Sequence, residues 1–276
     1  MEIGKTNRLK AARTTEFGFF LSDDEGNEVL LPNAYVSDEL KLEDEINVFI
    51  YRDSENRIVA TTLKPYVELD EFAYLKVNQV NKFGAFLDWG LPKDLMVPFS
   101  EQKERMEEGR SYIIFMFMDE STERLVATTN LNEFFYSDDI DVMQGDEVEL
   151  LLYKMSDLGM NAIVDNLYKG LIFKSDIHKD IRVGDRVRGY VKQVRNDGKI
   201  DLALEPIGYK DSIEKTADMI LSAINENDGV LSLTDKSSPE EISEVLGISK
   251  KAFKRGLGYL YKKKKVKLLE GGIKLS

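Results

Sequence analysis

The sequence predicts a mostly β chain in which three consecutive five-stranded barrels precede a C-terminal α+β domain. Three observations lead to this prediction. A pattern of short strands and turns recurs three times, the spacing of apolar residues becomes helical after Pro206, and a hairpin pattern ends the chain. A length of 276 residues suits several small domains. The expected domains are residues 1–64, 65–136 and 137–208 for the barrels and 209–276 for the last domain.

The repeat is clearest between the first two units. Residues 17–21, Phe-Gly-Phe-Phe-Leu, recur as Phe-Gly-Ala-Phe-Leu at 83–87. Both units also close alike, with Arg-Ile-Val-Ala-Thr-Thr at 57–62 and Arg-Leu-Val-Ala-Thr-Thr at 124–129. Because the two matches keep their order at offsets of 66 and 67 residues, they indicate two copies of one fold.

A more diverged third copy follows. Leu158-Gly159-Met160 takes the place of the Phe-Gly element, residues 170–173 take that of the next strand, and residues 199–204 close the unit. In each unit, alternating or apolar segments separated by turn-forming clusters predict five short strands and no long helix. A closed barrel fits this pattern, because closure removes the exposed edges of a five-stranded sheet.

The order of these elements resembles the ribosomal S1 RNA-binding domain, a Greek-key OB-fold barrel. In that family both aromatics of the Phe-Gly-x-Phe element lie on the nucleic-acid face, and a basic residue near the last strand joins them. The resemblance implies RNA contact for the matching residues, which are Phe17, Phe20, Phe83, Phe86 and Arg124 in the first two units and Arg195 and Lys199 in the third. Packing in the barrel cores is the alternative for the four phenylalanines.

Departures from the family pattern bear on this implication. Pro32, Pro98 and Phe173 stand where the family usually has a histidine, and the third unit lacks the aromatic pair. The first two units are acidic, which opposes a polyanion, so the alternative for them is a scaffold that keeps the barrel without strong binding. Trp89 follows a strand and is either a stacking platform or a partly buried loop aromatic.

The third unit contains the most promising binding strand. Alternation along residues 185–191 and beyond places Arg188, Tyr190 and Lys192 on one face. A tyrosine between two cations is typical of a surface for single-stranded nucleic acid, because bases stack on aromatic rings and cations neutralise phosphates. The alternative is a solvated outer face on which Tyr190 packs locally.

The residues after the third unit predict two helices joined by a short turn, preceded by another helix and followed by a hairpin. Apolar residues from Ile213 to Ile224 have helical spacing. Ser238-Pro239-Glu240-Glu241 is a capping-box start for the second helix, which Gly247 ends, and Ser249 caps the third. Residues 266–275 form the hairpin. The arrangement resembles a winged-helix domain.

Charge is distributed unevenly along the chain. Residues 1–149 carry 15 Lys and Arg against 32 Asp and Glu, whereas residues 150–276 carry 23 against 18. From 249 to 276 the count is 10 basic residues to 1 acidic residue. A polyanion is therefore expected to meet the second half. The candidate contacts there are Lys250, Lys251, Lys254, Arg255 and Lys263. Complementing the helix dipole is the alternative for the terminal lysines.

Composition narrows the possible chemistry. The chain has no cysteine and one histidine, His178, so disulfides, thiolate sites, Cys–His pairs and histidine clusters for zinc are excluded. No Gly-rich phosphate loop is visible. We therefore expect no catalysis, no metal and no cofactor. No apolar run approaches the roughly 20 residues that span a bilayer, and no secretory signal is visible, so we expect a cytoplasmic protein without a membrane partner.

Three S1-like units followed by a winged helix resemble the conserved virulence factor B family of Gram-positive bacteria. The resemblance includes Gly-Tyr-Val-Lys-x-Val-Arg-x-Asp-Gly-Lys-Ile-Asp-Leu at residues 189–202. It implies RNA binding and post-transcriptional regulation of gene expression, without catalysis. We expect single-stranded RNA to cross the third barrel and the winged helix. The alternatives are a DNA-binding transcription regulator that acts through the winged helix and an adaptor that binds proteins. The residues predict no particular oligomeric state.

Overall fold

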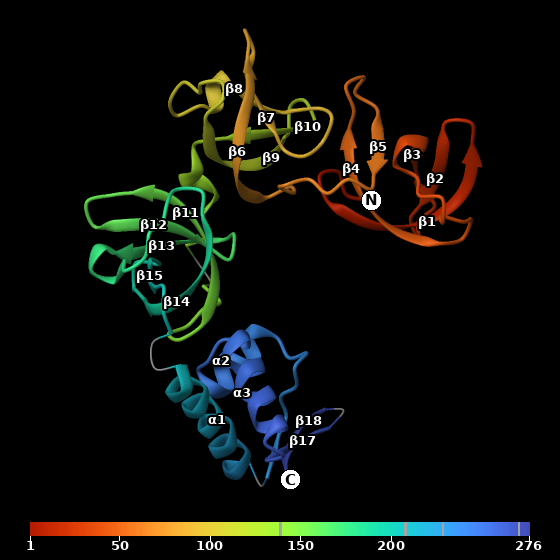
Figure 1. The fold of residues 1–276 in the computed structure, drawn as a ribbon. Helices are drawn as coiled ribbons and strands as arrows, with labels where there is room; N and C mark the ends of the chain where they lie inside the picture. Colours follow the sequence, from red (N-terminus) through yellow and green to blue (C-terminus); the bar gives the residue numbers. More distant parts are fainter. Residues whose placement is uncertain (138–139, 207–208, 228, 270) are drawn as a thin grey trace. The chain divides into compact units, whose positions relative to one another are not determined.

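A computed structural model describes residues 1–137, 140–206, 209–227, 229–269 and 271–276. The chain divides into two compact units, Met1–Phe134 and Phe135–Ser276. The first unit contains two closed barrels, and the second contains a third closed barrel and a helical C-terminal domain (Figure 1). The predicted fold class is therefore confirmed. The strands and helices of each domain lie within the range predicted for it, and the boundaries themselves stay predictions.

The first barrel closes in the order β1-β2-β3-β5-β4. Its strands are β1 (Thr6–Thr15), β2 (Gly18–Ser22), β3 (Glu28–Pro32), β4 (Glu45–Arg52) and β5 (Ile58–Thr61). All neighbouring strands pair antiparallel except β3 and β5, which pair parallel. Alternate side chains point inward and fill the barrel, among them Leu9, Leu21, Leu31 and Val48.

The second barrel repeats this topology. Its strands are β6 (Glu71–Val80), β7 (Gly84–Asp88), β8 (Leu95–Pro98), β9 (Ser111–Asp119) and β10 (Arg124–Thr128). The third and fifth strands, β8 and β10, again pair parallel. The continuous apolar run in β9 forms a strand whose centre, residues 113–116, is buried and whose ends are half-buried.

The third barrel has the same strand order despite its diverged sequence. Its strands are β11 (Glu147–Met155), β12 (Gly159–Val164), β13 (Tyr168–Phe173), β14 (Arg186–Val194) and β15 (Ile200–Ala203). In all three barrels a single 3-10 turn follows the third strand. The repetition of this irregular detail supports a common fold for the three units.

The glycine of the repeated motif is required by the neighbouring strand. A Cβ on Gly18 or Gly159 would lie 2.0 Å from a backbone carbonyl oxygen of the third strand, and one on Gly84 would lie 2.2 Å away. Gly18 and Gly159 also have φ of +146° and +154°, which side chains rarely tolerate. The motif therefore conserves close strand pairing inside each copy.

A shared core joins the first two barrels. Trp89 is 3 % exposed, and its ring meets those of Phe49 and Tyr51 edge-on at 5.7 and 6.2 Å between centroids. The Lys93 ammonium donates hydrogen bonds to the backbone carbonyls of Arg52 and Asp53. Of the two roles considered for Trp89, burial is the one that the structure shows.

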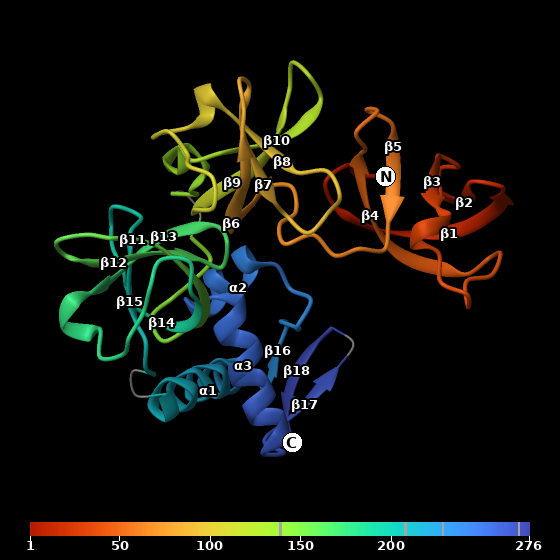
Figure 2. The ribbon, with the colours of Figure 1, turned by 45° about the horizontal axis from the view of Figure 1, so that its top comes forward.

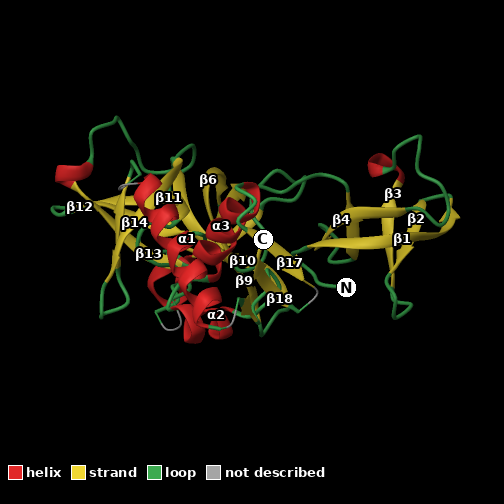
Figure 3. Cartoon of the chain, turned by 90° about the horizontal axis from the view of Figure 1, so that it is seen from below, coloured by secondary structure: helices red, strands yellow, loops and turns green. Residues whose placement is uncertain are grey.

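The C-terminal domain has the elements expected of a winged helix. They are α1 (Tyr209–Glu226), β16 (Val230–Leu231), α2 (Pro239–Leu246), α3 (Lys250–Lys262), β17 (Val266–Leu269) and β18 (Gly272–Leu275). Helix α1 packs against α3, and the sheet β16-β18-β17 completes the core (Figure 2). In the described part of the chain the long helices occur only here, and the barrels contain strands, loops and single turns (Figure 3).

The helix caps form as the sequence predicts. Ser238 and Glu241 form a reciprocal capping box at the start of α2, and Gly247 ends it in the left-handed conformation with φ of 65°. Ser249 caps α3. No helix among the described residues has the length and apolar character required to cross a membrane.

Candidate nucleic-acid interface

The aromatic pairs of the first two barrels point outward. Phe17 is 66 % exposed and Phe83 is 59 % exposed, so core packing is excluded for both. Phe20 and Phe86 are half-buried on the outer faces of β2 and β7. Unpaired bases stack on aromatic rings that are exposed on a barrel surface.

A neutralised cation covers the aromatic face of the first barrel. The Arg13 guanidinium lies 3.6 Å from the centroid of the Phe20 ring, and it donates three hydrogen bonds of 2.7 to 3.2 Å to the Glu28 carboxylate. These hydrogen bonds raise the pKa of Arg13 and lower the pKa of Glu28. A base can stack on Phe20 only after Arg13 moves, and the arginine offers little net charge.

The second barrel is less covered. The Lys82 ammonium lies 5.0 Å from the Phe83 ring centroid, and Arg105 lies 3.9 Å from that of Phe99, directly after β8. Arg124 is exposed at the start of β10. Burial and the nearby charge of Arg124 lower the pKa of Lys93. The predicted residues Phe83 and Arg124 are therefore both accessible, in a unit that is acidic overall.

The face of the third barrel that matches the S1 motif contains an aromatic residue that sequence reasoning missed. Phe173 ends β13, and the Arg195 guanidinium lies 5.6 Å from its ring centroid. Arg195 pairs with Asp201 at 2.7 Å, and this hydrogen bond raises the pKa of Arg195. Lys199 pairs with Asp197 at 2.8 Å and lowers the pKa of that carboxyl. The signal for Phe173 was its place at the end of the third strand.

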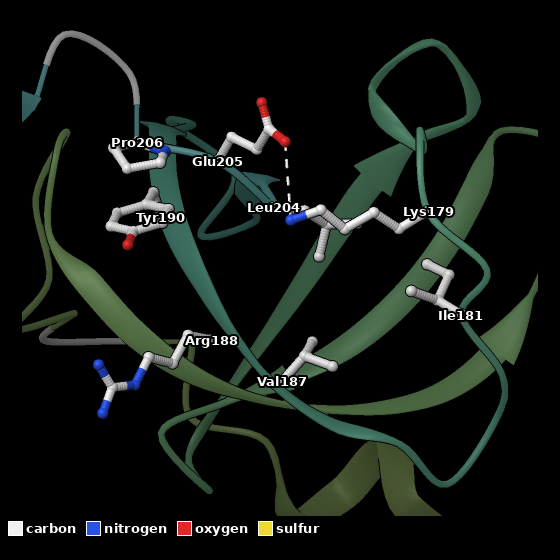
Figure 4. A pocket seen from close by; sticks show the side chains of 8 residues that line it. All are labelled: Lys179, Ile181, Val187, Arg188, Tyr190, Leu204, Glu205 and Pro206. Atoms are coloured by element: carbon white, nitrogen blue, oxygen red, sulfur yellow. Dashed lines mark ion pairs between the residues drawn. The ribbon is translucent and has the colours of Figure 1, made fainter.

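The three residues predicted to share one face of β14 lie at two different sites in the structure. Arg188 and Tyr190 point outward, and both line a hollow of about 650 Å³ (Figure 4). The register in which β14 pairs with β15 shifts between Val191 and Gln193, so Lys192 lies at a β-bulge. Its ammonium contacts Asp176 at 2.8 Å. The structure therefore brings Arg188 together with Tyr190 and directs Lys192 to the turn after β13.

Every predicted cation of the third barrel has an acidic partner. Besides the three pairs above, Arg188 contacts Glu147 at 3.4 Å. Such partly exposed pairs contribute about 0–1 kcal/mol each, so an incoming phosphate can replace the carboxylate at little cost. The surface of the third barrel therefore offers aromatic rings and cations whose carboxylate partners a phosphate can replace. It does not offer a strong positive field.

Five exposed lysines lie along α3 and just after it. Lys254 is exposed on the helix, and the four lysines 262–265 are exposed where it ends. None of these five forms an ion pair with another residue that the structure describes. The Lys263 ammonium lies 5.7 Å from the Tyr259 ring centroid. Because no carboxylate in the described part of the chain pairs with them, these lysines should attract a polyanion more strongly than the barrel cations do.

The beginning of α3 is docked on the third barrel. Asp146, fully buried, accepts hydrogen bonds from the Ser249 hydroxyl at 2.7 Å and from Arg255 Nη2 at 2.8 Å. Lys251 contacts Asp165 at 3.4 Å. Two predicted nucleic-acid contacts, Lys251 and Arg255, are thus engaged inside the second unit.

The half-buried Lys250 belongs to the same contact. Burial raises the pKa of the Asp141 carboxyl, and the nearby Lys250 backbone partly offsets that effect. The first turn of α3 therefore meets acidic side chains of the third barrel through Lys250, Lys251 and the Ser249 cap.

These features define a protein assembled from nucleic-acid-binding domains. The family model described as S1 domain matches residues 3–63 and 71–130, and that described as CvfB-like winged helix domain matches residues 218–275. The chain belongs to the conserved virulence factor B family, as the resemblance predicted.

Similar proteins span nearly the whole chain. Uncharacterized protein YitL of Bacillus subtilis is 31% identical over 96% of this chain and 91% of its own length. Conserved virulence factor B of Staphylococcus epidermidis is 27% identical over 99% of this chain and 95% of its own. A crystal structure of a multidomain protein with nucleic acid binding domains from Streptococcus pneumoniae is 26% identical, with a TM-score of 0.42, and covers 99% of this chain and 98% of that one.

Proposed function

We propose that this chain is a cytoplasmic regulator that binds single-stranded RNA through its third barrel and winged helix and acts after transcription, without catalysis. The observation that carries the proposal is the pairing of two kinds of surface within one compact unit. The barrel presents Tyr190 and Phe173, and the end of α3 presents lysines without carboxylate partners among the described residues. Aromatic rings bind unpaired bases and lysines bind phosphates, which is the combination that single strands require.

The docking of α3 favours RNA over duplex DNA. A helix-turn-helix protein reads duplex DNA with the N-terminal residues of its second helix, which enter the major groove. Here Ser249, Lys251 and Arg255 at that end are bonded to the third barrel. The opposite end of α3 stays open, where lysines can contact a backbone without reading base edges.

Competition between nucleic acids tests the choice of partner. We expect unlabelled single-stranded RNA of 20 nucleotides to displace a fluorescein-labelled copy at a concentration about tenfold or more below that of duplex DNA of the same sequence. The measurement is fluorescence anisotropy at fixed ionic strength, because affinities at different salt concentrations cannot be compared. Stronger displacement by the duplex would favour the transcription regulator instead.

Charge reversal tests the lysine surface. The variant Lys254→Glu/Lys263→Glu is expected to bind the labelled RNA at least about tenfold more weakly at 0.1 M salt. Each lost phosphate contact should also reduce the slope of log affinity against log salt by about 0.7. Lys41→Glu/Lys64→Glu, which reverses two exposed lysines of the acidic first unit, is the matched control. Equal losses in the two variants would point to net charge alone and contradict the proposed surface.

A further inference from the structure

We propose that the hollow beside Tyr190 is a pocket for one nucleotide of the bound RNA strand. This inference rests on the proposed function and extends it, because the hollow is lined by residues other than those of the S1 motif face. Its walls come from β14, the segment before that strand, and the residues after β15 (Figure 4). The lining residues are Lys179, Ile181, Val187, Arg188, Tyr190, Leu204, Glu205 and Pro206.

The lining chemistry fits a base. Ile181, Val187 and Leu204 supply apolar surface, and the Tyr190 ring stands at one side beside Pro206 (Figure 4). Burying the flat face of a base against an aromatic ring and apolar side chains is favourable for every base, which suits a strand read without strong sequence preference. The Tyr190 hydroxyl donates a hydrogen bond to Glu147 at 3.4 Å, which restrains the ring.

The rim fits the backbone on either side of that base. Lys179 reaches over the hollow from one side and Arg188 lies at the other (Figure 4). Each forms a long ion pair with a carboxylate. The N–O distance is 3.6 Å between Lys179 and Glu205 and 3.4 Å between Arg188 and Glu147. The Arg188 side chain is 77 % exposed, so a phosphate can reach the guanidinium and take the place of the carboxylate.

The test separates the pocket from RNA binding as a whole. Anisotropy titrations of the full chain use a fluorescein-labelled 12-nucleotide RNA. Tyr190→Leu keeps an apolar side chain but removes the ring, and we expect it to bind about tenfold more weakly with an unchanged salt slope. Tyr190→Phe keeps the ring and should bind within twofold of the parent. Tyr74→Leu, which alters an exposed strand tyrosine of the second barrel, is the control and should leave binding unchanged.

Arg188→Ala provides an independent arm. Because the exposed guanidinium contributes little to folding, this variant should fold normally and lower the salt slope by about 0.7. If Tyr190→Leu and Arg188→Ala both bind like the parent while the lysine reversal weakens binding, the pocket is refuted and the proposed function stands. If no variant changes binding, both are refuted. A matching thermal melt of Tyr190→Leu confirms that its loss of affinity is not a loss of fold.

Discussion

Replacing Gly159 with alanine is expected to lower the free energy of unfolding by about 3 kcal/mol, because the new methyl group would overlap the neighbouring strand. The added Cβ would lie 2.0 Å from the carbonyl oxygen of Ile172 and 2.9 Å from its carbonyl carbon. Backbone atoms cannot rotate away as a side chain does, so β12 and β13 must separate or the barrel must distort. The φ of +154° adds strain.

Urea unfolding of the full chain, followed by far-ultraviolet circular dichroism, measures this loss. Gly258→Ala is the control, because an added Cβ on this exposed side of α3 would meet no atom within 4 Å beyond its chain neighbours and the backbone of its own helix. That change should stabilise the helix by roughly 0.5–1 kcal/mol, since alanine has the higher helix propensity. An unfolding midpoint of Gly159→Ala equal to that of the parent would show that the strands separate at no cost and would contradict the argument.

Asp146→Ala is expected to lower the free energy of unfolding of the second unit by about 3 kcal/mol. The carboxylate is fully buried and accepts hydrogen bonds from the Met143 backbone, the Ser249 hydroxyl and the Arg255 guanidinium. Its removal leaves the Arg255 charge, three-quarters buried, without its anion and removes a partner of the Ser249 cap. The third barrel and the winged helix would therefore lose their strongest polar connection.

Two further variants isolate this connection. Asp197→Ala breaks an exposed pair with Lys199 and should cost less than about 0.5 kcal/mol. Adding Arg255→Met to Asp146→Ala removes the stranded charge, so the double variant should recover part of the stability that the single variant loses. Strictly additive losses would mean that the two residues do not depend on each other. Hydrogen exchange at α3 would show directly whether the winged helix has loosened.

Elements with local signals could be predicted from the sequence. The capping box of α2 lies within four consecutive residues, Ser238 to Glu241, and its hydrogen bonds form as expected. The barrels were predicted from repetition, because strand pattern, motif glycine and closing strand return in the same order. The sequence does not decide whether Phe17 and Phe83 are exposed, since an aromatic residue beside an alternating strand can face either side.

Contacts between distant residues could not be predicted in this way. Asp146 and Arg255 are 109 residues apart, and each has an ordinary local sequence in which nothing marks a partner. The same holds for Trp89, which is buried with rings of another barrel. The bulge at Lys192, which contacts Asp176, also cannot be predicted by assuming that side chains alternate strictly along the strand. One inserted residue changes the face on which later side chains lie.

The burial of Trp89 has a practical consequence for spectroscopy. It is the chain's single tryptophan, and it lies in the core shared by the first two barrels. We therefore expect its fluorescence to change when Met1–Phe134 unfolds. We expect little change in that fluorescence when Phe135–Ser276 unfolds or binds a ligand. Comparing that optical signal with the absorbance of the tyrosines, which occur in both halves, separates the two melting events in one unlabelled sample.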